Sequence, residues 1–331
     1  MDKRERLERT IAGELTDRAP VVLWRPFPGD DQRTADYTAA VIDFQLRYDW
    51  DACVIVPPWS FAGADYGLQD EWTGAGDASR VAIKRPIRRS LDWTDLRTPD
   101  PTRGEYGRMA AVVKAVCEGL AASQVPVVMM ILSPLAQAAR LTGYDLLRKH
   151  LRTRPDRLLT GLATLAEGTM RFIDSVRNSG LSGVALLIEH ADYDLLSEAE
   201  YETFGLPGDA AVLSGAPKSA WFKLASFAGT APMTRQFSRV QANIVGWDDR
   251  GGEPDLQAGR ALWSGAICGG LDTEKHIRAG SPTSIRDAVR DAVQVSGGRR
   301  LIVGSSRPTP VTAPHSNLRA ARTAVERMPI A

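Results

Sequence analysis

The stretch GVALLIEHADYD, residues 183–194, decides the fold and also marks a candidate site. Residues 183–188 are apolar without any polar alternation, which is typical of a strand buried on both faces, as in a parallel sheet. Polar side chains follow at once, beginning with Glu189 and His190. The stretch therefore predicts a core strand whose C-terminal end carries chemically active groups.

Seven further runs of this kind, rich in Val, Ile and Leu, occur along the chain. They are APVVLWR (19–25), ACVIVPPW (52–59), PVVMMILS (126–133), AWFKLASF (220–227), ANIVGW (242–247), GAICGG (265–270) and RLIVGSS (300–306). Segments with helical periodicity lie between them, including 33–50, 107–123, 156–180 and 284–298. Eight strand–helix units predict an α/β fold, a single TIM-type (β/α)₈ barrel over residues 1–331. A doubly wound open sheet is the alternative, although no GxGxxG motif follows the first run.

Residues 60–108 form a connection longer than a strand and a helix ordinarily need. The segment contains Trp72, a stretch rich in Gly and Asp, and the proline-containing sequence DLRTPDPTRGEYG. Long loops on a rigid scaffold commonly carry function. We therefore expect an extended excursion over the C-terminal mouth of the barrel.

The composition excludes several classes of protein. The chain has 331 residues, 44% hydrophobic and 24% charged, as ordinary globular enzymes have. A net charge of +1 without a dense basic run argues against nucleic acid and anionic membranes as partners. No apolar run reaches the roughly 18 residues of a membrane span, and the charged segment MDKRERLERTIAGE lacks the apolar core of a signal peptide. We expect a cytoplasmic protein.

The strand ends supply the candidate catalytic groups, because active sites of (β/α)₈ barrels lie at the C-terminal ends of the strands. Glu189 and His190 follow one run, and Asp248 follows another. An imidazole titrates near neutral pH, so we expect His190 to transfer protons, oriented by Glu189 or Asp248. The alternative is that His190 caps a loop by hydrogen bonding to the backbone.

The same ends supply the candidate substrate-binding groups. They are Arg25, Arg140, Arg307, Trp59, Trp247 and Asp249. Guanidinium groups bind carboxylates bidentately, and indole rings form the walls of pockets for planar or apolar ligands. Two alternatives stay open: Trp247 suits the core equally well, and Asp249 suits a structural ion pair with Arg250 at the rim.

Cysteine and histidine spacing indicates no metal site. Cys53, Cys117 and Cys268 are too few and too scattered for a disulfide framework. No CxxC or HxxxH spacing of a zinc site occurs. The sequence therefore predicts a pocket that uses neither metal nor cofactor and binds an anionic small molecule.

Five segments carry a resemblance to a known family, and the resemblance covers nearly the whole chain. They are APVVLWRPFPG (19–29), DWDACVIVPPWSFAGADYG (49–67), SGLSGVALLIEHADYDLLSEAEYETFGLP (179–207), ALWSGAICGGLDT (261–273) and GRRLIVGSSRPTPVTAPHSNLRAARTAV (298–325). They resemble the uroporphyrinogen decarboxylase superfamily, a group of (β/α)₈ barrels that also contains corrinoid- or thiol-dependent methyltransferases. The resemblance implies a homodimer.

Several positions depart from the decarboxylase pattern that the resemblance implies. Arg25 stands at the first arginine of the family's Arg-Gln-Ala-Gly-Arg motif, but Gly29 replaces the second. Pro58 stands where the family has the aspartate that supports decarboxylation. The family's tyrosine falls near Arg140, and its C-terminal histidine falls at Arg307. The resemblance therefore implies another substrate than the tetrapyrrole of the decarboxylase.

The methyltransferase branch of the resemblance implies zinc, held by His and Cys at the ends of the fifth and eighth strands. The corresponding sequences here are LASFAG (224–229) and GSSRP (304–308). Neither contains a side chain that suits zinc. Three hypotheses remain: a metal-free lyase of the decarboxylase type, a methyl- or other group transferase, and a catalytically silent family member that binds a ligand.

Overall fold

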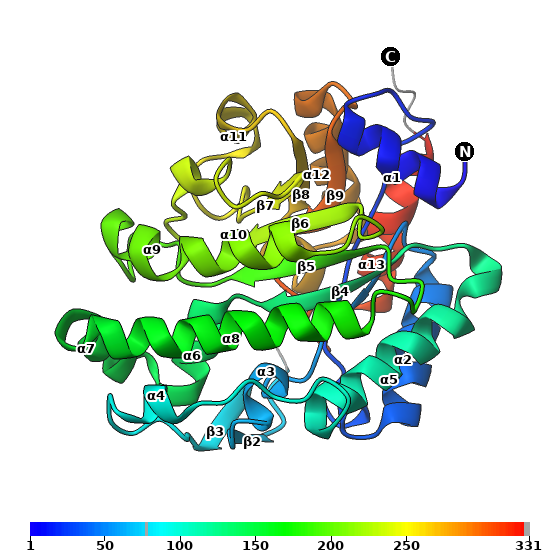
Figure 1. Ribbon diagram of the computed structural model, residues 1–331. Helices are drawn as coiled ribbons and strands as arrows, with labels where there is room; N and C mark the ends of the chain where they lie inside the picture. The colour runs from blue at the N-terminus through cyan, green and yellow to red at the C-terminus, as the bar shows by residue number, and fades with distance from the viewer. Residues whose placement is uncertain (77–78, 328–331) are drawn as a thin grey trace.

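The computed structural model describes residues 1–76 and 79–327. At its centre is a parallel sheet of seven strands in the order β1-β4-β5-β6-β7-β8-β9, curled into a half-barrel (Figure 1). The strands are β1 (Cys53–Ile55), β4 (Val127–Leu132), β5 (Gly183–Ile188), β6 (Phe222–Phe227), β7 (Ile244–Gly246), β8 (Ala266–Leu271) and β9 (Leu301–Ser305). The predicted α/β fold with a barrel-like sheet is confirmed.

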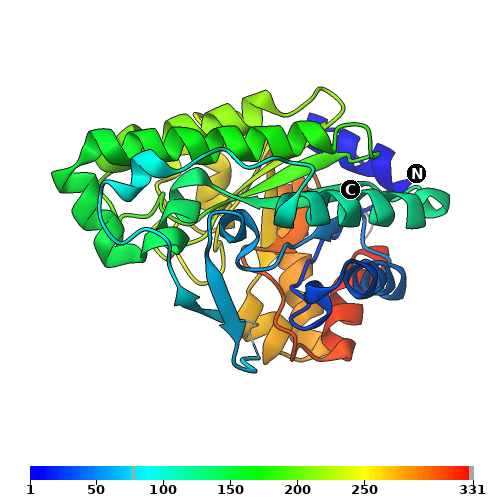
Figure 2. The ribbon, with the colours of Figure 1, turned by 60° about the horizontal axis from the view of Figure 1, so that its bottom comes forward.

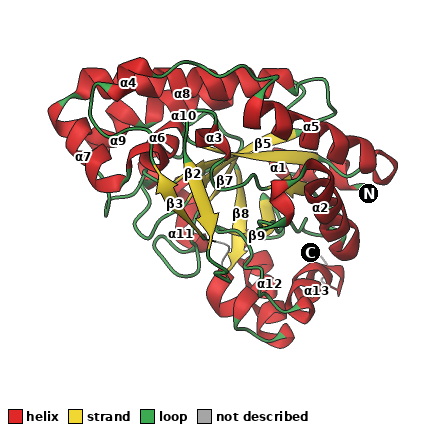
Figure 3. Cartoon of the chain, turned by 90° about the horizontal axis from the view of Figure 1, so that it is seen from below, coloured by secondary structure: helices red, strands yellow, loops and turns green. Residues whose placement is uncertain are grey.

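Helices surround the sheet (Figures 1 and 3). The α-helices are α1 (Lys3–Ala12), α2 (Thr34–Tyr48), α3 (Phe61–Ala64), α4 (Asp92–Asp95), α5 (Gly104–Gly119), α6 (Pro134–Thr142), α7 (Tyr144–Thr153), α8 (Pro155–Ser175), α9 (Glu198–Phe204), α10 (Leu206–Gly215), α11 (Leu256–Leu262), α12 (Pro282–Ser296) and α13 (His315–Ala324). Shorter helical turns are η1 (Asp30–Gln32), η2 (Ala121–Ser123), η3 (Thr234–Gln236), η4 (Thr273–Arg278) and η5 (Val325–Arg327). The four segments with helical periodicity became α2, α5, α8 and α12, so this prediction is confirmed. In the described part of the chain, no helix combines the length and the apolarity needed to cross a bilayer.

The first predicted strand, residues 19–25, departs from the prediction. Val21 forms a single parallel bridge with Val303 of β9. On its other side the Asp51 amide donates to the Val21 carbonyl at 2.9 Å, just before β1 begins. One hydrogen bond does not make a ladder, so the barrel is not fully closed along this seam.

The two faces of the sheet carry different side chains because successive residues of a strand point to opposite sides. Val128, Met130 and Ala185 belong to a compact apolar cluster inside the curled sheet. Leu186 and Ile188 of β5 belong to the larger cluster, in which helical residues also take part. This alternation also decides which side chains just beyond a strand point toward the mouth.

A buried carboxylate holds the seam together. Asp51 is fully buried and accepts a hydrogen bond from the Val21 amide at 2.7 Å. It also accepts from Arg6 of α1 at 2.8 Å, and from both terminal nitrogens of Arg18 at 2.8 and 2.9 Å. Arg6 binds Asp17 in addition, at 2.7 Å. The network connects α1, residues 17–21 and the start of β1, where the sheet supplies only one hydrogen bond.

The predicted excursion, residues 60–108, contains an antiparallel hairpin of β2 (Gln69–Trp72) and β3 (Arg80–Lys84). Viewed from below, the hairpin lies in front of the sheet (Figures 2 and 3). The Val311 amide donates to the Gly76 carbonyl at 3.1 Å, which connects the hairpin to the segment after β9. The hairpin thus extends across the mouth, as predicted.

We expect Asp51→Asn to destabilise the protein by about 3–5 kcal/mol, the scale for breaking a buried ion pair. An amide brings no negative charge and only one acceptor oxygen, so the buried Arg6 and Arg18 lose their shared counter-ion. The free energy of unfolding from urea titration would measure the loss.

The matched control is Asp43→Asn on α2. Asp43 is 64% exposed and pairs at 3.0 Å with Arg47, which is 56% exposed. Exposed pairs contribute less than about 1 kcal/mol, so the control should unfold almost as the wild type does. Equal losses in the two variants would contradict a special role for Asp51.

Candidate functional site

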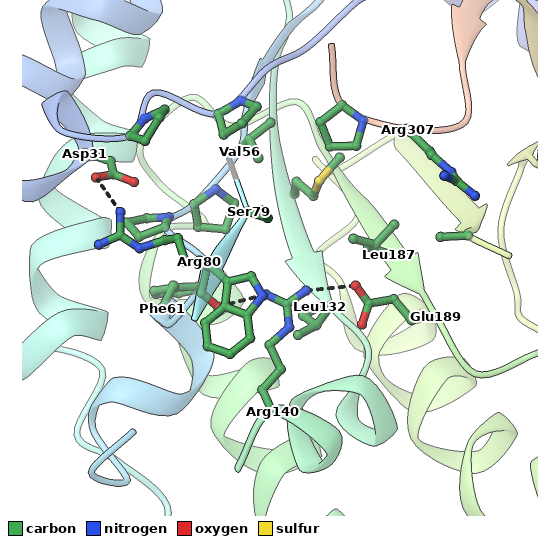
Figure 4. A pocket seen from close by; sticks show the side chains of 18 of the residues that line it. Asp31, Val56, Phe61, Ser79, Arg80, Leu132, Arg140, Leu187, Glu189 and Arg307 are labelled. Carbon is green, nitrogen blue, oxygen red and sulfur yellow. Dashed lines mark hydrogen bonds and ion pairs between the residues drawn. The ribbon is translucent and has the colours of Figure 1, made fainter. Parts of the chain in front are cut away.

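A cavity of about 510 Å³ opens at the C-terminal ends of the strands. Its floor is apolar, formed by Val56, Met130, Leu132 and Leu187, which follow or lie in β1, β4 and β5. Charged side chains stand around this floor on different segments of the chain (Figure 4). The volume lies within the usual range for small-molecule sites.

One wall is built by Arg140 and Glu189. Helix α6 starts at a Ser133 cap directly after β4, and Arg140 lies near its end. The Arg140 guanidinium donates to Glu189 Oε1 at 2.8 Å and to the Trp59 carbonyl at 2.9 Å, and it lies 4.7 Å from the centre of the Trp59 ring. Three of the sequence-predicted site residues therefore meet at this wall.

Asp31 and Arg80 stand on the opposite side of the cavity from Glu189 (Figure 4). Asp31 is buried, and Arg80 Nη1 lies 3.9 Å from its Oδ1, while Arg80 Nε donates to Asp70 at 3.0 Å. Burial raises the pKa of Asp31 above its ordinary value, against the opposing effects of the Gln32 amide and Arg80. The sequence analysis missed both residues, because η1 and the hairpin follow no strand end.

Arg307 lies on the same side of the cavity as Glu189 (Figure 4). The Ser305 hydroxyl donates to the Arg307 carbonyl at 2.8 Å, which fixes the backbone there. Thr273 and Glu274, from the π-helical turn η4 after β8, also line the cavity. A lone π-helical turn is often found at functional sites, and here it follows a strand end.

His190, which the sequence predicts to transfer protons, lies outside the cavity. The alternation of β5 places Leu187 and Glu189 on the cavity side and His190 on the other face, in phase with Ile188. His190 is 4% exposed, and its ring centre lies 6.0 Å from that of Tyr144 of α7. Burial lowers the pKa of His190, while Glu189 opposes this effect.

Arg25 also lies outside the group of residues that line the cavity. Its guanidinium carbon is 4.8 Å from the ring centre of Phe27 and 5.4 Å from that of Phe44. The neighbouring Pro26 lines the cavity instead. Burial lowers the pKa of Arg25.

The residues after β7 have structural contacts away from the cavity. Trp247 is fully buried and donates through Nε1 to the Pro254 carbonyl at 2.6 Å. The Asp249 carboxylate accepts from the Gly270 amide at 2.9 and 3.1 Å, and burial raises its pKa to about 6. Asp248 accepts from the Gly251 amide at 2.9 Å. These contacts order the β7–α11 connection.

The strand ends also bear on the zinc that the resemblance to the methyltransferases implies. Beyond β6 the chain continues with Ala228 and Gly229, and beyond β9 with Ser306 and Arg307. Within residues 1–76 and 79–327, no three His, Cys, Asp or Glu side chains come together as a metal site would require. The side chains at these strand ends do not fit zinc.

Comparison with known proteins identifies the family. The family model described as uroporphyrinogen decarboxylase (URO-D) matches residues 2–328, and the chain belongs to this family. It is similar in structure to a methyltransferase from Methanosarcina mazei, with a TM-score of 0.86 and 15% identity over 98% of each chain. It is also similar to a B12-independent methionine synthase from Shewanella sp. W3-18-1 in complex with selenomethionine, with a TM-score of 0.58 and 10% identity over 93% of this chain and 91% of that one. No curated protein matches. At these identities the two structures show the shared fold alone.

We expect His190→Gln to reduce the loss of stability on acidification. Its pKa in the folded protein lies below the ordinary 6.5, so the unfolded chain binds more protons once the pH falls below that value. Wild-type stability should therefore decline as the pH falls through about 6.5. The variant should lose less stability over this range, because it lacks the contribution of His190 protonation. Melting temperatures of both proteins between pH 7.5 and 5 would measure it. Identical pH dependence would show that His190 is protonated without cost in the folded state.

Proposed function

We propose that this protein is an enzyme that binds a carboxylated small molecule and carries out a lyase reaction of the decarboxylase type. The observation that carries the proposal is the pair of carboxyl groups, Asp31 and Glu189, on opposite sides of one cavity that also contains Arg307. An acid–base reaction on an anion needs these groups: a proton donor, a second titratable group and a cation that holds the substrate.

The two carboxyl groups have environments that suit different roles. Asp31 is 3% exposed, and burial favours its protonated form. Glu189 is 31% exposed and accepts a hydrogen bond from Arg140 at 2.8 Å. Two carboxyl groups held in different environments are a recurring device for assigning acid and base. We assign the proton donor to Asp31.

The proposed step balances without a co-reactant. The bond between the substrate carbon and its departing carboxylate breaks, and CO₂ leaves while the electron pair stays on carbon. Asp31 transfers its proton to that carbon and recovers one from solvent. Arg307 binds an anionic group that the product retains.

Transfer of a methyl group is the second candidate. The similarity to the methyltransferase from Methanosarcina mazei extends over 98% of both chains and favours it. In that reaction the same cavity would bind the donor or the acceptor, and Arg307 would again hold an anionic group. Zinc has no role in this candidate, because residues 1–76 and 79–327 bring no three His, Cys, Asp or Glu side chains together as ligands.

Screening carboxylic acids for enzyme-dependent CO₂ release, with methyl transfer followed in parallel by mass spectrometry, tests the proposal. On a substrate found in this way, Asp31→Asn and Glu189→Gln should each lower turnover about 10²–10⁴-fold, the scale for acid–base groups. Wild-type turnover should fall as the pH rises through the raised pKa of Asp31, because the donor then loses its proton.

The control variant is Glu167→Gln, which alters an exposed Glu–Arg pair on α8. It should retain full turnover. Methyl transfer without CO₂ release would replace the lyase reaction by the second candidate. Wild-type turnover in Asp31→Asn would contradict the assignment of the donor, and ligand binding without any product would indicate a catalytically silent member.

A further inference from the structure

The charged groups of the cavity are largely paired with one another. Arg140 has Glu189 at 2.8 Å, and Arg80 has Asp70 at 3.0 Å with Asp31 at 3.9 Å. The remaining carboxylate, Glu274, has Arg278 outside the cavity at 2.5 Å. A ligand therefore meets two guanidinium groups that already have counter-ions.

Arg307 is different. Its guanidinium has no hydrogen bond or ion pair with any residue in the described ranges 1–76 and 79–327, and the residue is exposed in the cavity. The Ser305 hydroxyl donates to the Arg307 carbonyl, which fixes the backbone of Arg307. The five N–H donors of its guanidinium group are available to a ligand. An anion bound here would not have to displace a protein carboxylate.

The rest of the cavity favours an apolar occupant. Besides the apolar floor of Val56, Met130, Leu132 and Leu187, six prolines line the cavity: Pro26, Pro28, Pro57, Pro58, Pro308 and Pro310. Proline has no backbone N–H, so these positions offer no donor to an anionic group. The prolines and the floor together present rigid apolar surface.

We propose that the substrate of this cavity has an apolar body with one anionic anchor, which Arg307 binds, and carries no further anionic group except the carboxylate that departs. This inference rests on the proposed function only in taking the cavity as the substrate site, and it specifies the class of substrate. Additional anionic groups would face Glu189 and Glu274, whose cationic partners Arg140 and Arg278 are already engaged, so a substrate with three or more anionic groups is disfavoured.

The ion pairs between the charged groups of the cavity also determine the environment of a departing carboxylate. Such a group would lie over the apolar floor, where no unpaired cation from the described residues stabilises its charge. Loss of that charge as neutral CO₂ is favoured in an apolar environment. The anchor at Arg307 stays on the product, so a product analogue is a body with one anionic group.

Isothermal titration calorimetry with three probes tests the inference: 2-naphthoate, the neutral 2-naphthalenemethanol, and benzene-1,3,5-tricarboxylate. Naphthoate should bind most tightly and the tricarboxylate most weakly. Arg307→Gln should weaken naphthoate binding by about tenfold to a hundredfold, the effect of losing a hydrogen-bonded charge, and leave binding of the alcohol within about twofold. Arg307→Lys should recover part of the loss, because it restores the charge without the fork.

Two further variants distinguish the contribution of the anionic anchor to binding affinity from that of the apolar body. Leu187→Asn should weaken naphthoate and the alcohol alike, because it makes the floor polar. Arg89→Gln, which alters an exposed arginine paired with Asp92 away from the cavity, should change neither affinity. Circular dichroism would verify the fold of each variant.

The inference is overturned if the tricarboxylate binds more tightly than naphthoate, if no probe binds, or if Arg307→Gln leaves naphthoate affinity unchanged. These are binding measurements, so they do not depend on which reaction occurs. If the probes bind in the predicted order but the screen detects no CO₂ release, the lyase proposal is wrong and the proposed class of ligand is still supported.

Discussion

A single buried carboxylate bridges the seam of the sheet, where the first apolar run and the segment before β1 share one backbone hydrogen bond. Asp51 brings together the Val21 amide and the guanidinium groups of Arg6 and Arg18. Apart from these polar contacts, the segments are held by one backbone hydrogen bond and by apolar packing of Leu7 and Val22 against Val54. A buried ion network is costly to desolvate and is stable only when its hydrogen bonds are satisfied, as those of this carboxylate are.

The sheet is a half-barrel because its seam is open. Side chains from segments outside the sheet complete the lining of the mouth. The η1 turn after the first run contributes Asp31, and the hairpin contributes Arg80. Their contact at 3.9 Å joins the hairpin to the start of the chain on the side of the cavity opposite Glu189. The hairpin is therefore both a cover and a source of functional groups, which suits the proposal that the chemistry occurs beneath it.

The geometry of one strand end decides which group faces the ligand. Residues of β5 alternate between the curled interior and the helical layer, and Glu189 continues the interior series. His190, one position later, is buried beside Tyr144. A shift of one residue would have exchanged the carboxylate for an imidazole at the wall next to Arg140, and with it the acid–base properties of the site.

The sequence by itself determined the α/β class, the eight core runs, the principal helices and the excursion over the mouth, because apolar periodicity is a local property. It also indicated Arg140, Glu189, Arg307 and Trp59, which follow strands closely enough for the chain to place them at the cavity. Only the tertiary structure decided that His190, Arg25 and Trp247 point elsewhere, because strand phase and packing partners are not encoded in spacing alone. It alone brought in Asp31 and Arg80, since residues far apart in the chain meet only when the sheet curls and the hairpin folds across it.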